Sequence, residues 1–505
     1  MKLYLEKGEV GMAGNDAKGS HVGRRDFIKT TTLASVAVTL PGTSLVAQDG
    51  IKGAFKPSPE GIKRNVLFLT DSPKKYESLI NKIRAIREFE FTVSSVELNL
   101  QKSPDIASSI RGKNADIVLM TLPQVTTSSG NIAASAGDLD VPVILFPVNL
   151  DLIMLEADVA AKFRARGINA MLANSEAHAI ELIKIAATPR ILEGKRALIF
   201  GRPFDSTSVP ALNLNEDYIY KHTGVRLQYR PIEELRQRLE SIDEATARKE
   251  MERWKKEATE VVETTDKAIL DSSRLYFLLR SIVEKEGLSG LSIDCLSFSF
   301  NSNPILPYPC LPFTRLRDEG FAVPCEAEVC GMLSSMVLQE ISRKPSYFCN
   351  VSAVDAGKST AVLRHCVAPL KLMGSGAPAL PYRLRDYHGT GRGVTAEIQF
   401  PAGLDISMGG FSKDLKEFVL WPGKTISRVR DTDRPSFENM PNSKMRRYCS
   451  NHLEVKIKDV DSFIQKIAGC HHAMVAGNYR KAVSDAMQRM NVRITGPSDL
   501  SALES

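Results

Sequence analysis

The stretch Asn65-Val-Leu-Phe-Leu-Thr70, followed by Asp71-Ser-Pro73, gives the first indication of the fold. A short apolar run that stops at a turn and a helix start is typical of a buried strand. Further apolar runs follow at 91–98, 115–121 and 141–147, and the segments between them have helical periodicity. Strands that alternate with helices at this spacing predict βαβ units and a parallel sheet.

A second series of the same kind begins at residue 195. Apolar runs at 195–201, 225–229 and 291–300 enclose a long charged stretch, 244–285, with helical periodicity. Beyond about residue 375 the pattern changes to alternating runs broken by Gly, Pro and Asp, which indicates an antiparallel sheet or a small barrel. The fold class is therefore predicted as α/β, with two Rossmann-like parallel-sheet domains followed by a C-terminal domain that contains an antiparallel β-barrel.

These patterns predict a division of the chain into five segments. They are a twin-arginine signal peptide at 1–47, a linker at 48–63, an N-terminal α/β domain at 64–194, a second α/β domain at 195–345, and a C-terminal domain at 346–505.

The signal peptide is inferred from Arg24-Arg25, with Phe27 two residues on, the apolar run 30–40 and a possible cleavage site after Ala47. This arrangement resembles a twin-arginine export signal. The alternative is a basic tail ahead of a short core helix. Export predicts a periplasmic or extracellular protein that folds first in the cytoplasm and has the twin-arginine machinery as a partner. The apolar run is shorter than the roughly 20 residues that span a bilayer, so no stable membrane span is expected.

Composition excludes several classes of protein. The 505 residues are 43% hydrophobic and 25% charged, as in ordinary globular proteins with more than one domain. The formal net charge of +7 is interleaved with acid, as in the stretch 250–257, and no basic stripe with aromatics is present. Nucleic acid is therefore not an expected partner.

Eight cysteines are present, and six of them lie between Cys295 and Cys366. Folding in a reducing compartment favours buried free thiols, with disulfides as the alternative. No CxxC pair occurs, so a zinc ribbon is not expected.

Three short motifs carry candidate metal ligands: Cys325-Glu326-Ala-Glu328, Arg364-His365-Cys366 and Cys470-His471-His472. Carboxylate oxygens and imidazole nitrogens together suit a divalent cation. Each motif has a simpler interpretation. The glutamates could cap a helix that starts at Pro324, and His365 could be a core residue. Adjacent histidines on a strand face opposite ways, so one of the pair could serve structure alone.

The stretch from Asp355 to Thr360, with Gly357-Lys358-Ser359, imitates the end of a phosphate-binding loop. Such a loop needs an earlier glycine, and that position is Ser352. Nucleotide binding is therefore not predicted.

The order of these pieces resembles the L-fucose isomerase and L-arabinose isomerase superfamily over residues 64–497. The matching motifs are Leu316-Arg-Asp318-Glu-Gly320, Cys325-Glu326-Ala-Glu328, Tyr347-Phe-Cys-Asn350, Leu363-Arg-His365-Cys366, Gly393-Val-Thr395 and Gly469-Cys-His-His472, followed by Gly477. The resemblance implies two α/β domains, a C-terminal β-barrel and aldose–ketose isomerisation, which is an intramolecular oxidoreductase reaction, at a Mn²⁺-type site. It also implies a homo-oligomer, with a hexamer as one expected form.

Carried over by position, the resemblance implies that Glu326 is a metal ligand and acid/base, and that His365 and His472 are metal ligands. Asn350 occupies the position that the second metal-binding carboxylate has in the fucose branch. The resemblance therefore implies that Asn350 is a catalytic and metal-binding residue. An amide can coordinate through oxygen but cannot accept a proton, and loss of a positioned acid/base typically costs about 10²–10⁴ in rate.

The sequence therefore predicts an exported, metal-dependent carbohydrate enzyme that moves a proton on a sugar through an enediol, with Mn²⁺ or another divalent cation as cofactor. Two alternatives remain. One is a non-catalytic sugar-binding protein on the same fold, and the other is a metal-assisted epimerase or lyase that acts on a sugar derivative.

Overall fold

The computed structural model describes residues 63–497, apart from residues 88, 99–104, 123–127, 138, 140, 150, 189, 207–210, 300–305, 392 and 428–448. The expected signal peptide and all but the last residue of the expected linker lie outside the described residues. Within the described part, none of the helices combines the length and the apolar character needed to cross a membrane.

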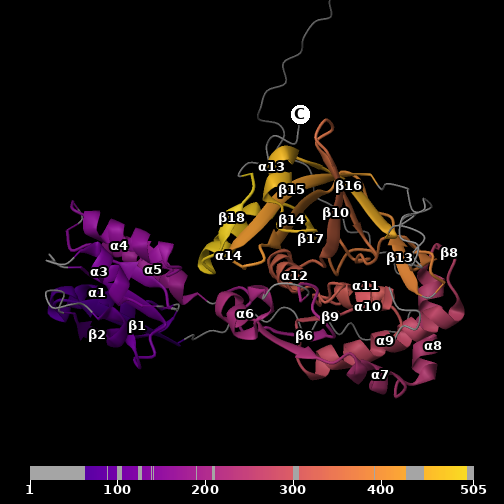
Figure 1. The fold of residues 1–505 in the computed structure, drawn as a ribbon, viewed down its shortest axis with the longest axis horizontal. Coiled ribbons are helices and arrows are strands. Elements are labelled where there is room, and N and C mark those ends of the chain that lie inside the picture. Colours follow the sequence, from indigo (N-terminus) through magenta and orange to yellow (C-terminus); the bar gives the residue numbers. More distant parts are fainter. Residues whose placement is uncertain are drawn as a thin grey trace, which may run out of the picture. The chain divides into compact units, whose positions relative to one another are not determined.

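The first part of the described chain is a doubly wound parallel sheet, with the strand order β2-β1-β3-β4-β5 (Figure 1). Its strands are β1 (Lys63–Thr70), β2 (Glu90–Glu97), β3 (Ile117–Met120), β4 (Val143–Leu145) and β5 (Ala170–Leu172). Its helices are η1 (Pro73–Tyr76), α1 (Glu77–Arg84), α2 (Ile106–Ile110), α3 (Ser129–Ser135), α4 (Met154–Ala165) and α5 (Glu176–Ala187). In β1, Val66 and Phe68 join one hydrophobic core while Leu67 and Leu69 join another, so this strand is buried on both faces.

The second parallel sheet has the order β7-β6-β9. Its strands are β6 (Arg196–Phe200), β7 (Arg226–Arg230) and β9 (Gly290–Ile293). The helices of this region are η2 (Leu212–Leu214), α6 (Glu216–Thr223), α7 (Glu233–Leu239), α8 (Glu244–Glu257), α9 (Asp266–Lys285), α10 (Leu296–Ser299), α11 (Cys310–Asp318) and α12 (Val329–Ser342). Leu198 and Phe200 of β6 face one core, and Ala197 and Ile199 face another that includes α12. Helices therefore cover both faces of this sheet as well.

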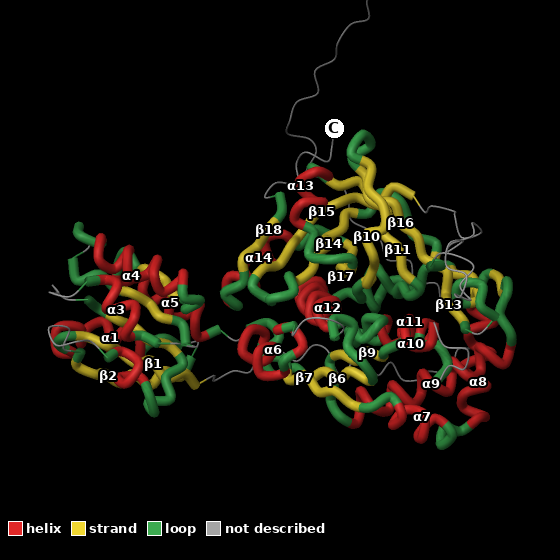
Figure 2. The backbone as a smooth tube through the Cα atoms, in the orientation of Figure 1, coloured by secondary structure: helices red, strands yellow, loops and turns green. Residues whose placement is uncertain are grey.

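The C-terminal region contains a closed antiparallel barrel in the order β14-β17-β10-β11-β16-β15, because β14 also pairs with β15 (Figure 2). The barrel strands are β10 (Tyr347–Asp355), β11 (Thr360–His365), β14 (Asp405–Phe411), β15 (Glu417–Ser427), β16 (Asn451–Ile457) and β17 (His471–Ala476). Outside it lie β18 (Arg493–Thr495), α13 (Val460–Lys466), α14 (Arg480–Arg489) and a small sheet of β8 (Glu260–Val261), β12 (Tyr382–Asp386) and β13 (Val394–Ile398). The predicted fold class is confirmed.

Several element boundaries differ from the sequence-based expectations. The charged stretch 244–285 is two helices, α8 and α9, separated by the short strand β8. Residues 418–421 and 425–427, which the sequence pattern divides into two runs, belong to one strand, β15. The helix expected to begin at Pro324 begins at Val329, because Glu326 and Ala327 before it adopt left-handed backbone conformations with φ of 69° and 53°.

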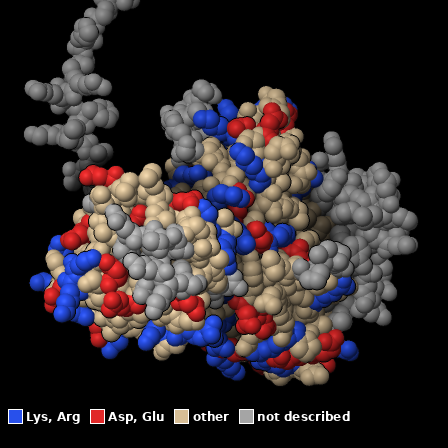
Figure 3. Space-filling view, turned by 60° about the vertical axis from the view of Figure 1, so that its left-hand side comes forward, with Lys and Arg blue, Asp and Glu red and all other residues tan. Residues whose placement is uncertain are grey.

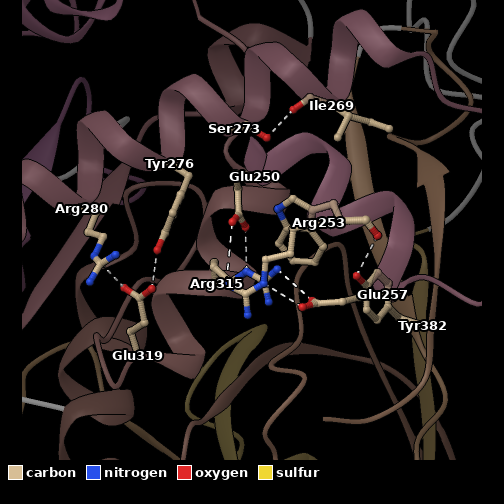
Figure 4. Close-up of polar contacts among 11 residues, drawn as sticks. Glu250, Arg253, Glu257, Ile269, Ser273, Tyr276, Arg280, Arg315, Glu319 and Tyr382 are labelled. Carbon is tan, nitrogen blue, oxygen red and sulfur yellow. Dashed lines mark hydrogen bonds and ion pairs between the residues drawn. The ribbon is translucent and has the colours of Figure 1, made fainter. Parts of the chain in front are cut away.

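A buried ion-pair network ties α11 to α8 (Figure 4). The Arg315 guanidinium donates to Glu250 at 2.9 Å and to Glu257 at 3.0 Å, and it lies 4.0 Å from the ring centre of Trp254. Loss of one partner from a buried ion pair typically costs about 3–5 kcal/mol, because the other charge stays buried. This network therefore fixes α11 near the loop that leads to Glu326.

Charged side chains of both signs are interspersed over the visible surface (Figure 3). Many are partners of one another along the exposed faces of helices, such as Arg248 with Glu244 and Lys267 with Asp271.

Candidate functional site

The candidate site lies beyond the carboxyl end of β9, in the turn that precedes α12. In open parallel sheets this end of the strands is where ligands usually bind. The Ala327 N–H donates to Ile293 O at 3.0 Å, at the end of β9, and the Glu326 N–H donates to the Cys295 sulfur at 3.3 Å. Two consecutive left-handed non-glycine residues are strained, at about 1–3 kcal/mol each, and persist only where the surroundings hold them. The turn thus fixes the position of the Glu326 carboxylate.

Two barrel strands bring histidines to this carboxylate. His365 is the last residue of β11, and His471 is the first residue of β17. The His365 Nε2 lies 3.6 Å from Glu326 Oε1, and the His471 Nε2 lies 3.2 Å from Glu326 Oε2. The Phe348 ring packs against both imidazoles, with ring centres 4.9 and 4.6 Å apart. One carboxylate and two imidazoles from distant segments therefore meet at one point.

Burial makes this cluster electrostatically unusual. The side chains of His365 and His471 are 2% and 4% exposed, whereas Glu326 is 18% exposed and so remains accessible from outside. Burial opposes ionisation of Glu326, but the adjacent imidazoles of His365 and His471 outweigh burial and hold its pKa well below the usual range. Burial likewise disfavours the imidazolium form of His471, but hydrogen bonds with Cys470 and Glu326 raise its pKa to about 10. Glu326 and His471 thus form a buried ion pair.

The donor set fits a divalent cation. The ligand atoms of Glu326, His365 and His471 all lie within 4.8 Å of one another. Both ring nitrogens of His365 are buried without a hydrogen bond, which is costly unless something else binds there. Bonds of about 2.1 Å from one ion to neighbouring ligands place those ligands roughly 3.0–3.4 Å apart, close to the two observed separations. These residues therefore qualify as a candidate metal centre, and the geometry does not identify the metal.

The structure does not bring His472 to Glu326. Successive residues on a strand face opposite sides, so when His471 enters the site His472 points away. His472 is fully buried, its ring centre is 6.0 Å from that of Phe463, and burial lowers its pKa to about 4. The histidine of the pair that meets Glu326 is therefore His471, in place of the expected His472.

Asn350 lies beside the cluster on β10, the strand between β11 and β17. It pairs with His471 on one side and with Arg364 on the other. Directly paired residues of neighbouring strands point to the same side of the sheet, so the Asn350 amide shares a face with His471. Asn350 is half-buried at this point, and its expected roles as a metal ligand and catalytic residue stay predictions.

Glu328 has a different role from Glu326. Its carboxylate caps α12 by accepting from the Gly331 N–H, and it also pairs with Lys413 at 3.0 Å. Lys413 pairs in addition with Asp205 at 2.7 Å. The capping interpretation of Glu328 is confirmed.

Sequence reasoning missed Phe204, Asp205 and Lys413, which lie around the cluster. The Phe204 ring packs edge-on against His471 at 5.1 Å, and the Lys413 ammonium lies 5.7 Å from the same phenyl ring. Phe204 and Asp205 follow β6 at the carboxyl edge of its sheet. Ligands usually bind at this edge, so the position of the two residues directly after an apolar run is the sequence signal that could have indicated them. Asp355, by contrast, is the last residue of β10, where it accepts from the Lys358 N–H of the turn that leads to β11.

Comparisons with known proteins give a limited similarity. No known family model matches the sequence. A segment of 155 residues, 30% of the chain, is 22% identical to the sulfoquinovose isomerases of Priestia aryabhattai and of Priestia megaterium (strain ATCC 12872 / QMB1551). The chain matches 34% of the length of these curated relatives. The similarity is therefore to sugar isomerases, over a part of the chain.

Proposed function

We propose that this protein is a metal-dependent sugar isomerase-like enzyme that interconverts an aldose and a ketose. The single observation that carries the proposal is the convergence of Glu326, His365 and His471. The partial similarity to sulfoquinovose isomerases supports the same class of reaction, and the motifs shared with the L-fucose and L-arabinose isomerase superfamily support the same fold. The substrate in this proposal is a sugar or a sugar derivative.

In this proposal the cation, Mn²⁺ or a similar ion, is held by Glu326, His365 and His471, and when bound it supplies a Lewis acid for the sugar oxygens. The residues of the chain then have distinct tasks. His365 and His471 are fixed by the ends of their strands and by Phe348, so they hold the site in place. Glu326 is the partly exposed carboxylate and can face the substrate.

Isomerisation needs a group that carries a proton between C1 and C2 of the sugar. Asn350 cannot do so, because a carboxamide is neither an acid nor a base near neutral pH. Of the three titratable side chains of the cluster, His365 and His471 would hold the cation through their imidazoles, so the partly exposed Glu326 carboxylate is the candidate for this task. The low pKa of Glu326 makes it a weak base by itself. The proposal therefore includes slow turnover, because the site has an amide at Asn350 and its carboxylate, Glu326, is a weak base.

Asn350 also favours a second candidate, a sugar-binding protein on the same fold that has lost turnover. A metal-assisted epimerase or lyase would use the same cluster on a sugar derivative. Export through the twin-arginine pathway, and assembly into a homo-oligomer, complete the proposal and rest on the sequence motifs alone.

The test is elemental analysis of the purified protein, followed by a panel of aldoses assayed with the metal found. We expect about one ion at the cluster, conversion of at least one aldose, and loss of both in Glu326→Gln. Asp355→Asn, which alters the carboxylate at the last residue of β10, is the matched control and should keep the ion. Sugar binding without turnover, unchanged by chelator, would favour the binding protein instead.

A further inference from the structure

A second cluster of metal-ligating side chains lies next to the first and is not used by the proposed reaction. Cys366 follows β11, His388 follows β12, and Cys449 precedes β16. Their ligand atoms all lie within 4.8 Å of one another. The Cys366 Sγ is 2.9 Å from His388 Nε2, and the Cys449 Sγ is 3.9 Å from the same nitrogen.

A third cysteine adjoins this group. Cys310 is the first residue of α11, and its thiol interacts with that of Cys366, which also interacts with the thiol of Cys449. Cys310 and Cys366 are 2% and 6% exposed, and His388 is 6% exposed. Three buried side chains and the half-buried Cys449, in all three thiols and one imidazole, are thus gathered from four separate elements.

The chemistry of this set differs from that of the Glu326 cluster. Three sulfurs and one nitrogen are the ligands of structural Zn²⁺ sites, which are tetrahedral and closed to substrate. With Zn–S bonds of about 2.3 Å and Zn–N bonds of about 2.0–2.1 Å, neighbouring ligand atoms of a tetrahedron lie roughly 3.5–3.8 Å apart. The 2.9 and 3.9 Å separations lie on either side of this value. The Cys310 sulfur is not among the atoms that lie within 4.8 Å of one another, so its side chain would have to turn toward the other three ligands to complete the tetrahedron.

We propose that Cys310, Cys366, His388 and Cys449 bind one structural Zn²⁺ ion. The ligand spacing does not follow a CxxC pattern, because each ligand stands at the end of a different element. Zinc binding by these residues displaces the thiol protons and needs no oxidant. The ion would join α11, β11, β12 and β16, and no disulfide connects these elements among the described residues.

A zinc ion at this position would also help to hold His365 of the first cluster in place. Cys366 directly follows His365, so an ion held by Cys366 fixes the end of β11 at the residue that faces Glu326. The Asn451 amide reinforces the same point by donating to Cys366 O at 3.1 Å. The zinc site would thus act as a positioning element for His365.

The decisive experiment uses the full chain, purified without chelator under reducing conditions. We expect one zinc per chain, and X-ray absorption at the zinc edge should show three sulfurs and one nitrogen at about 2.3 and 2.0–2.1 Å. Because this measurement uses the unaltered protein, it does not depend on whether a variant folds. Absence of zinc after incubation with stoichiometric Zn²⁺, or a shell without sulfur, would overturn the proposal.

Variants then assign the ligands. Cys366→Ser and Cys449→Ser should lose zinc, and Cys310→Ser should keep at most a weakly bound ion with two sulfurs. Cys470→Ser, an exposed cysteine outside the cluster, is the matched control and should keep one zinc. Glu326→Gln should lose the ion of the first cluster and keep zinc, which separates this proposal from the proposed function. Mass spectrometry that finds a Cys366–Cys449 disulfide in the reduced preparation would contradict the zinc site.

Discussion

The Nε2 of His471 lies 3.2 Å from the Oε2 of Glu326, although the glutamate follows a parallel sheet and the histidine begins a barrel strand. The pair exists because the carboxyl edge of β9 faces the starting end of β17. Every step of the proposed chemistry depends on this contact between the turn that follows a parallel sheet and a strand of the barrel, and both residues can be altered separately.

His471→Gln should weaken binding of the divalent ion by at least about 10-fold, because even a change of an outer-shell partner typically costs 10–100-fold. The matched control is His472→Gln, one residue along, whose side chain points away from Glu326. Its metal affinity should match that of the unaltered protein. Isothermal titration of the metal-free protein with Mn²⁺ measures both, and stronger loss in the His472 variant would contradict the assignment.

The His471 pKa of about 10 gives the metal-free protein a defined pH dependence. A histidine whose pKa is raised on folding stabilises the folded state fully below its unfolded pKa, about 6.5, and this contribution is lost as the pH rises toward the folded value. Chelated protein should therefore lose stability between about pH 7 and 10 in chemical denaturation. In His471→Gln this decline should be smaller.

Metal binding should follow the opposite trend. The ion must displace the proton of His471, so affinity should increase as the pH rises toward about 10. Titrations in two buffers of different ionisation enthalpy should report about one proton released per ion. Release of no proton would mean that His471 is neutral in the metal-free protein, contrary to the ion pair with Glu326.

Much of this arrangement could be predicted from the sequence, because the relevant signals are local. The apolar runs around Val66–Leu69 and Ala197–Phe200 identify buried parallel strands, and the motifs around Glu326 and His365 indicate candidate ligands. The choice between His471 and His472 could not be made, because the two faces of a strand are distinguished only once its register is known. Zinc ligands such as Cys310 and Cys449 were missed for a related reason, since no short spacing connects them.

Asp318 offers a test of buried charge away from both clusters. Burial raises the pKa of its carboxyl to about 7, against the hydrogen bond that it accepts from the Lys371 N–H at 2.8 Å. An acid with a raised pKa favours the folded state fully below its unfolded value of 3.8, and this advantage is lost as the pH rises through about 7. Asp318→Asn should remove that loss and stabilise the protein at alkaline pH by up to about 4 kcal/mol. Denaturation from acid to alkaline pH checks this, with the exposed Asp485→Asn as control.

Gly331 connects helix packing to the candidate site. A Cβ at this position would overlap the Phe348 ring and the Glu328 carboxylate. Gly331→Ala should therefore cost about 1–3 kcal/mol of stability, as overpacking does. Because Phe348 packs on both His365 and His471, metal affinity should fall as well. Gly376→Ala, where nothing lies within 4 Å, is the control, and equal effects of the two changes on melting and metal affinity would contradict this account.

Asn350→Asp tests whether the amide at this position slows turnover by the proposed isomerase. The change places a carboxylate on β10 beside His471, where it can neutralise the cation and accept a proton. If the protein is an isomerase slowed by its amide, turnover of its aldose substrate should rise, by as much as about 10²–10⁴-fold. Asn350→Ser, which removes the amide without adding charge, should give no such gain. A tighter metal with unchanged turnover in the aspartate variant would show that the chemistry does not pass through this position, and would favour the sugar-binding alternative.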